Sequence, residues 1–79
     1  MTYEIIKKII DTWDPIKLLT FAPKDEYDEE SMKIFKCYTD DAKELSEIIF
    51  NVFKTAFEES FTKSNLECIE VANLIIRYS

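Results

Sequence analysis

Apolar residues recur at helical spacing along the chain. From Tyr3 to Trp13, apolar doublets return every four residues and most charged residues fall between them. A second stretch is expected to begin near Asp25 or Asp28 and to end near Tyr38. Its carboxylates crowd the first turn and its lysines come later, as the helix dipole prefers. These two patterns each predict an amphipathic helix.

Two further helices are predicted from clear start signals. Asp41 to Glu44 has the form D-x-x-E, in which the aspartate caps the helix and the glutamate reaches back, and a long apolar stripe follows. The segment ESFTKSN then breaks the stripe. Ser64 to Glu67 is a capping box of the form S-x-x-E, and the apolar face that follows leads to Arg77 in a last turn. Helices this short need mutual packing to be stable.

The composition agrees with an all-α fold. The 79 residues correspond to one small domain, and 47% of them are hydrophobic, enough to fill a core. The chain has no glycine, the residue that most readily adopts the positive-φ turns of sheet proteins. We therefore predict a compact four-helix domain over residues 1–79, with a short extra turn between the first two helices.

That extra turn lies in the stretch WDPIKLLTFAPKDEYDEE, residues 13–30. Asp14 is expected to cap one turn of α- or 3₁₀-helix, because Pro15 at a first helical position loses no needed donor. Ile16 would point into the core beneath Trp13. Tyr27 would cover the connection, with its hydroxyl bonded to a backbone or carboxylate partner. In this interpretation the stretch is a structural corner.

The same stretch can also be interpreted as a protein-binding edge, because tyrosine and tryptophan anchor interfaces and surrounding charge steers a partner. Which interpretation holds depends on whether the two aromatic side chains face inward or outward. The residues of this predicted acidic, aromatic edge are Trp13, Asp14, Asp25, Glu26, Tyr27, Asp28, Glu29 and Glu30.

The absence of histidine and glycine excludes several kinds of catalytic and binding site. Without histidine the chain has no Ser-His-Asp or Cys-His catalytic group and no imidazole metal ligand. Without glycine it has no Gly-rich phosphate loop. The carboxylates of residues 25–30 could bind a hard cation, but the glycine and the D-x-D-x-D spacing of an EF-hand are missing. We predict a non-enzymatic protein without a cofactor; a metal-dependent enzyme that uses these carboxylates is the rival hypothesis.

The net charge of −6 disfavours nucleic acid and anionic membranes as partners and favours a basic protein. The N-terminus lacks the features of a signal peptide and no apolar run approaches membrane-spanning length, so a cytoplasmic location is expected. Cys37 and Cys68 each lie on an apolar helix face and are predicted to be reduced core residues.

The segments WDPI (residues 13–16) and, about ten residues on, AP-DEYD-E (residues 22–30) resemble the signature of the YugE-like family, small uncharacterised proteins of Gram-positive bacteria. The resemblance covers nearly the whole chain. It implies a short, all-helical domain and no known activity. Lys17 departs from the pattern, because glycine is expected at this position. Similar segments also resemble those of bacterial immunity proteins that neutralise a cognate toxin.

Together these observations predict a helical domain that acts by binding another protein. A wide apolar face could also form a homodimer interface. The sharper alternative is an immunity or antitoxin protein whose acidic face blocks a basic toxin.

Overall fold

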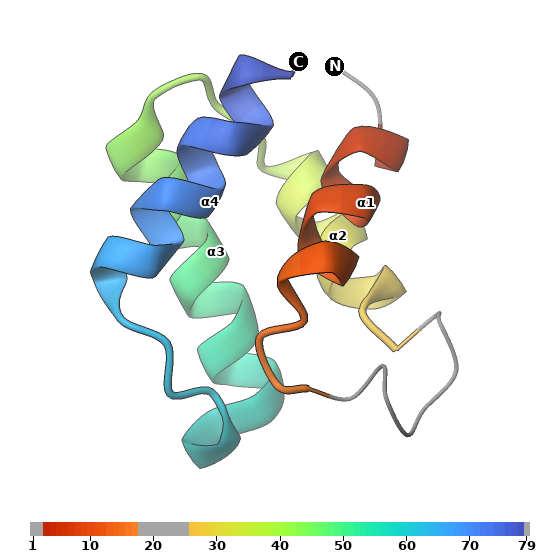
Figure 1. Cartoon of the computed structure of the whole chain (residues 1–79), viewed down its shortest axis with the longest axis vertical. Helices are drawn as coiled ribbons and strands as arrows, with labels where there is room; N and C mark the ends of the chain where they lie inside the picture. The colour runs from red at the N-terminus through yellow and green to blue at the C-terminus, as the bar shows by residue number, and fades with distance from the viewer. Residues whose placement is uncertain (1–2, 18–25, 79) are drawn as a thin grey trace.

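Four α-helices build the protein in the computed structural model, which describes residues 3–17 and 26–78 (Figure 1). No strand occurs among these residues. The all-α, four-helix prediction is confirmed. A single-turn 3₁₀-helix, η1 (Glu58–Ser60), follows the longest helix. The α-helices are α1 (Tyr3–Trp13), α2 (Asp28–Lys36), α3 (Ala42–Phe57) and α4 (Asn65–Arg77).

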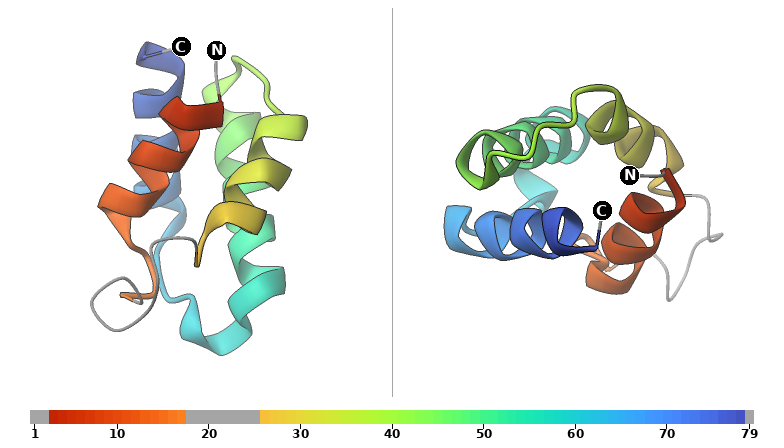
Figure 2. Two further views of the ribbon diagram at one scale, coloured as in Figure 1. Left: turned by 90° about the vertical axis from the view of Figure 1, so that its right-hand side faces the viewer. Right: turned by 90° about the horizontal axis from the view of Figure 1, so that it is seen from above.

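The helices surround one core. α3 packs against α4 and α2, and α1 packs against α2 and α4. The view from above in Figure 2 shows this closed arrangement. The start of α1 and the end of α4 lie at the same end of the molecule (Figure 1). α1 and α4 run in opposite directions beside each other (Figures 1 and 2). Among the described residues, none of the helices combines the length and the apolar character that a membrane span requires.

The centre of the core is aromatic. Phe53 is fully buried and stacks on Phe57 and Phe61 at ring-centroid distances of 5.9 and 5.6 Å. Trp13 and Tyr27 meet the ring of Phe53 edge-on. Aliphatic side chains from all four helices close around this cluster, among them Ile6, Ile10, Ile34, Leu45, Ile49 and Ile75.

Both predicted helix starts with a capping side chain are confirmed. Asp41 accepts hydrogen bonds from the backbone N–H groups of Lys43 at 3.0 Å and Glu44 at 3.3 Å. The Asp41 N–H, which a capping box would pair with the Glu44 side chain, donates to Thr39 Oγ1, so the predicted reach back by Glu44 is wrong. Ser64 Oγ accepts from the Glu67 N–H at 3.2 Å. These caps satisfy N–H groups that the helices cannot pair internally.

The corner after α1 contains the predicted extra turn, but Asp14 does not begin a helix there. Its N–H donates to Ile10 O at 2.9 Å, and its φ of 44° is in the left-handed region, as is common where a helix ends. The next residues form a β-turn, in which the Lys17 N–H donates to Asp14 O at 3.0 Å. The capping role predicted for Asp14 is therefore wrong.

Lys17 has a φ of 60°. This left-handed conformation suits glycine, which has no Cβ to clash with its own backbone. The structure thus gives a physical reason for the glycine that the family resemblance places at this position.

The two cysteines differ in exposure. Both are free thiols, and Cys68 is buried as predicted, whereas Cys37 is exposed. The prediction was wrong for Cys37 because α2 ends at Lys36, so that Cys37 lies at the C-cap, past the helical face that buries Ile34. Burial raises the pKa of the Cys68 thiol to about 11, with a further contribution from the charge of Glu67.

Candidate functional site

Tyr27 faces inward. Its side chain is fully buried, and its ring meets Phe53 and Phe57 edge-on at 5.8 and 6.0 Å. Its hydroxyl donates to Asp14 Oδ1 at 2.5 Å and accepts the Ile16 N–H at 3.2 Å. The carboxylate partner predicted for this hydroxyl is confirmed. Tyr27 therefore joins the corner after α1 to the start of α2 from inside the core.

Trp13 is only half-buried. Its ring packs edge-on against Phe53 at 5.7 Å and against Phe61 at 6.0 Å. The same side chain also lines a surface groove between α1 and α4. Trp13 thus combines contact with the core and contact with the surface.

The carboxylates of the predicted edge do not share one surface. Glu26 and Glu29 are exposed, Asp28 is half-buried, and Glu30 is only 6% exposed. Asp25, which was also considered as a helix start, lies outside the described residues. Glu26 and Glu29 are therefore the exposed carboxylates of the described edge.

Glu30 is a buried carboxylate on the first turn of α2. Its Oε1 atom has no hydrogen-bond partner among the described residues. Burial raises the pKa of Glu30, and the charges of Glu29 and Glu26 add to this rise; a hydrogen bond from its own backbone and the charge of Lys33 oppose it. The ionised form is therefore disfavoured in the folded protein.

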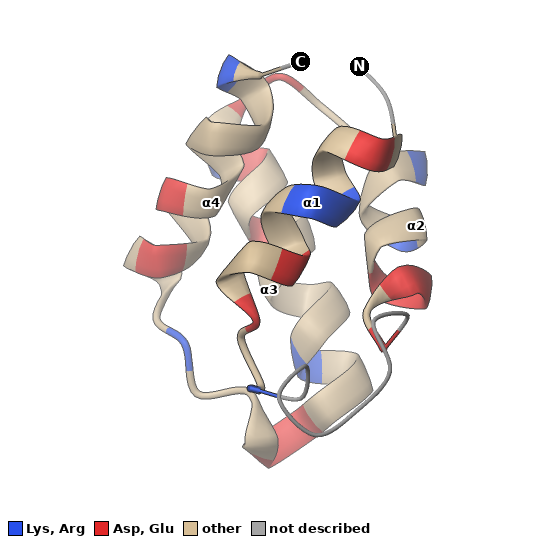
Figure 3. Cartoon of the chain, turned by 45° about the vertical axis from the view of Figure 1, so that its right-hand side comes forward, with Lys and Arg blue, Asp and Glu red and all other residues tan. Residues whose placement is uncertain are grey.

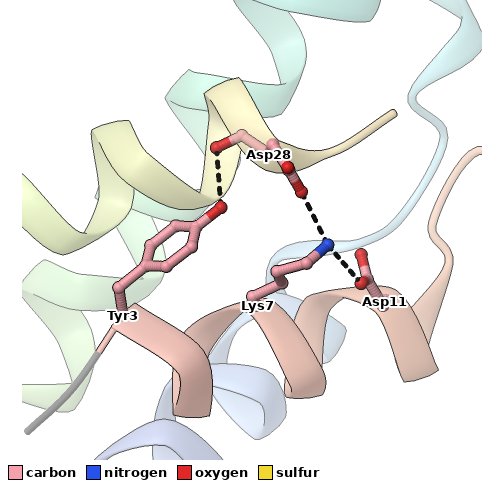
Figure 4. Close-up of polar contacts among 4 residues, drawn as sticks. All are labelled: Tyr3, Lys7, Asp11 and Asp28. Atoms are coloured by element: carbon pink, nitrogen blue, oxygen red, sulfur yellow. Dashed lines mark hydrogen bonds and ion pairs between the residues drawn. The ribbon is translucent and has the colours of Figure 1, made fainter. Parts of the chain in front are cut away.

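Asp28 is paired with a lysine that the sequence did not single out (Figure 4). Lys7 Nζ lies 2.6 Å from Asp28 Oδ1 and 2.9 Å from Asp11 Oδ2. The Tyr3 hydroxyl donates to Asp28 O at 3.4 Å. Hydrogen bonds to Asp28 and Asp11 raise the pKa of the Lys7 ammonium above its ordinary value. These contacts connect α1 to α2, which is a structural role.

The described carboxylates offer no metal centre. In residues 3–17 and 26–78, no group of three or more His, Cys, Asp or Glu side chains is arranged to hold a metal ion. Asp28 bonds to Lys7, and Glu30 is turned into the protein.

A surface groove of about 790 Å³ is lined by α1 on one side and by α4 on the other. The isoleucine doublets of α1 explain its apolar wall, because Ile6 and Ile10 are fully buried in the core while Ile5 and Ile9 line the groove. The opposite wall, on α4, includes Leu74 and Tyr78, which are 42% and 59% exposed. Sequence reasoning missed the groove. The signals for it were the isoleucine doublets of α1 and the apolar residues near the end of α4.

The groove carries opposite charges on its two sides. Lys8 lines it from α1, and Glu67 and Glu70 line it from α4. Figure 3 shows a basic band at the middle of α1 and acidic bands on the first half of α4. The two glutamates are three residues apart, so they lie on the same side of their helix.

The fold and this groove define a small helical protein with an open apolar cleft between two antiparallel helices. The chain belongs to a family described as Domain of unknown function (DUF1871), which matches residues 4–78. No curated protein and no solved structure matches the chain. The narrower resemblance to the YugE-like proteins stays a prediction.

Proposed function

We propose that this protein is a non-enzymatic interaction domain that binds a protein chain in the groove between α1 and α4. The observation that carries the proposal is the groove itself, with partly exposed apolar side chains on both walls. Contiguous apolar surface on a soluble protein is typical of interaction sites. Trp13 and Tyr78 are of the residue types that most often anchor interfaces.

The open form of the groove favours a protein over a small ligand. Small-molecule sites enclose most of their ligand and converge a few polar groups on it. Here Lys8, Glu70 and Leu74 are all exposed to solvent, and the charged side chains come from opposite helices. A helical surface of another chain can cover such a groove along its length.

Two exposed leucines of α4 give a matched test. Leu74 lines the groove, whereas Leu66 is 68% exposed and lies outside it. The protein captured by the wild-type chain from its native cell is identified, purified and titrated against Leu74→Glu and Leu66→Glu. We expect Leu74→Glu to abolish binding and Leu66→Glu to leave it unchanged, with both variants helical by circular dichroism. Full binding by Leu74→Glu would refute the proposal.

The net charge of −6 supports a second candidate, the neutralisation of a basic toxin through the exposed carboxylates Glu26 and Glu29. The double variant Glu26→Gln/Glu29→Gln, measured in the same titration, separates the two surfaces. Loss of binding in this variant alone would place the interface on the acidic edge. Unchanged binding would exclude these two side chains.

A further inference from the structure

We infer that the occupant of the groove between α1 and α4 is a second copy of this chain. In the dimer, a two-fold axis runs parallel to the groove, so that α1 of each copy lies on α4 of the other. The inference rests on the proposed function, since it names the protein that the groove binds.

The charges on the groove select this arrangement. Lys8 is the midpoint of α1, and Glu70 is next to the midpoint of α4. The middles of these two antiparallel helices lie at similar heights in Figure 1. A two-fold axis parallel to the groove leaves the position of each residue along the groove unchanged. It exchanges the α1 side of the groove with the α4 side. Lys8 of each copy then meets Glu70 of the other, which makes two equivalent pairs of opposite charge.

The other two-fold arrangement is disfavoured. An axis across the groove would place α1 on α1 and α4 on α4. The acidic sides that carry Glu67 and Glu70 would then face each other, and like charges at an interface oppose binding. A groove with one basic and one acidic side is therefore complementary to its own copy in one orientation.

The apolar side chains fit the same arrangement. Leu74 and Tyr78 are the most exposed apolar residues of the groove, and both come from the α4 side. When α4 of one copy lies against α1 of the other, these side chains cover Ile5 and Ile9. Each copy gives and receives the same contact, as an isologous interface requires.

The net charge of each copy opposes association. Each carries −6, but at physiological salt the repulsion between exposed charges is screened beyond about 8 Å. The close pairs at the groove and the apolar contact act within that distance, so they decide whether the dimer forms.

Charge reversal tests the arrangement. The purified chain is examined by sedimentation equilibrium together with Lys8→Glu, Glu70→Lys and an equimolar mixture of these two variants. We expect the wild type to dimerise and each single variant to dimerise about tenfold more weakly, because each creates two like-charge contacts. In the mixture, a Lys8→Glu copy that pairs with a Glu70→Lys copy has opposite charges at both contacts. A heterodimer of wild-type strength is therefore expected.

Controls separate this inference from the proposed function. Leu66→Glu is expected to dimerise like the wild type, and circular dichroism checks that each variant is folded. A purified chain that stays monomeric, or a dimer that neither charge reversal weakens, would overturn the second copy as occupant. If a different purified protein then binds and Leu74→Glu abolishes that binding, the groove keeps its proposed function. If no protein binds the groove, both proposals fail.

Discussion

Asp14 and Tyr27 close the corner between α1 and α2 through one hydrogen bond. Aspartate tolerates the left-handed conformation better than most residues, because its short polar side chain can bond locally. The Asp14 side chain accepts from the Tyr27 hydroxyl, which is buried inside the core. The same hydroxyl pairs the Ile16 N–H. The Tyr27 hydroxyl therefore bonds to two groups of the corner, the Asp14 carboxylate and the Ile16 N–H.

We expect Tyr27→Phe to destabilise the protein by about 2 kcal/mol. The phenylalanine keeps the ring in the core but leaves the Ile16 N–H and the Asp14 carboxylate without this partner, and hydrogen bonds to charged groups contribute about 1.5–3 kcal/mol. Urea unfolding gives the free energy. A double-mutant cycle with Asp14→Asn, which keeps the tolerance for a left-handed backbone, measures the coupling. Independent effects of the two changes would show that the hydrogen bond contributes nothing.

Lys17 offers a test of backbone strain. Its φ of 60° costs a residue with a Cβ about 1–2 kcal/mol, part of which glycine loses again through its freer unfolded chain. Lys17→Gly should therefore stabilise the protein by about 0.5–1 kcal/mol in thermal or urea unfolding. Lys17→Ala removes the same exposed side chain but keeps the Cβ, so it should not stabilise. Equal effects of the two changes would contradict the role of φ.

At the scale of elements, the first turn of α2 places carboxylates of very different exposure side by side. Glu29 is exposed and suits the positive end of the helix dipole, whereas Glu30 is buried, with one oxygen that has no partner in the described part of the chain. Periodicity placed Ile34 of α2 correctly, since it is fully buried, but Phe35, which the same spacing puts on that face, is 36% exposed. It did not reveal that a carboxylate would be covered as well.

The raised pKa of Glu30 has a consequence for stability. The folded-state pKa of Glu30 lies above the ordinary value of 4.5. Folding therefore takes up a proton at pH values between 4.5 and the folded-state pKa. The contribution of Glu30 to stability is therefore unfavourable at neutral pH, and the penalty disappears as the pH falls through the folded pKa towards 4.5. Glu30→Gln should be more stable than the wild type at about pH 7, with a difference that shrinks near about pH 4.

Urea unfolding of both proteins at the two pH values measures this difference. Glu29→Gln is the matched control, because it removes an exposed charge from the same turn and should change stability by less than about 0.5 kcal/mol. A Glu30→Gln variant that is less stable than the wild type at neutral pH would show that an interaction of the carboxylate outweighs its burial.

At the scale of the whole molecule, the aromatic cluster unites segments that are far apart in the sequence. Trp13 from the end of α1 and Phe61 from the segment after η1 both pack against Phe53 of α3. The cluster therefore fixes where α1 ends relative to α3. The same placement leaves part of Trp13 facing the groove.

Removing the indole should cost stability through a cavity next to Phe53. We expect Trp13→Ala to destabilise the protein by about 3 kcal/mol, the lower end for a large aromatic residue, because Trp13 is half-buried. Urea unfolding checks this value, and Leu66→Ala, at an exposed site of α4, should stay within about 0.5 kcal/mol of the wild type. If Trp13→Ala left the free energy of unfolding unchanged, the tryptophan would serve a partner and not the core.

Much of the fold could be predicted because its signals are local. The caps at Asp41 and Ser64 depend on neighbouring backbone groups, and the apolar stripes of the helices depend on spacing within each helix. Cys37 shows the limit, since a helix that ends at Lys36 leaves it exposed. The predicted edge assumed that neighbours in the sequence share one surface, but Tyr27 and Glu29 lie on opposite sides of the boundary between core and solvent.

The sequence by itself determined four amphipathic helices, and its lack of histidine removed imidazole chemistry. Only the tertiary structure decided that Tyr27 and Glu30 face inward, and that Ile5 and Ile9 line a groove. Periodicity fixes on which side of its own helix a residue lies. It does not fix which other helix covers that side, because this depends on how all four helices pack.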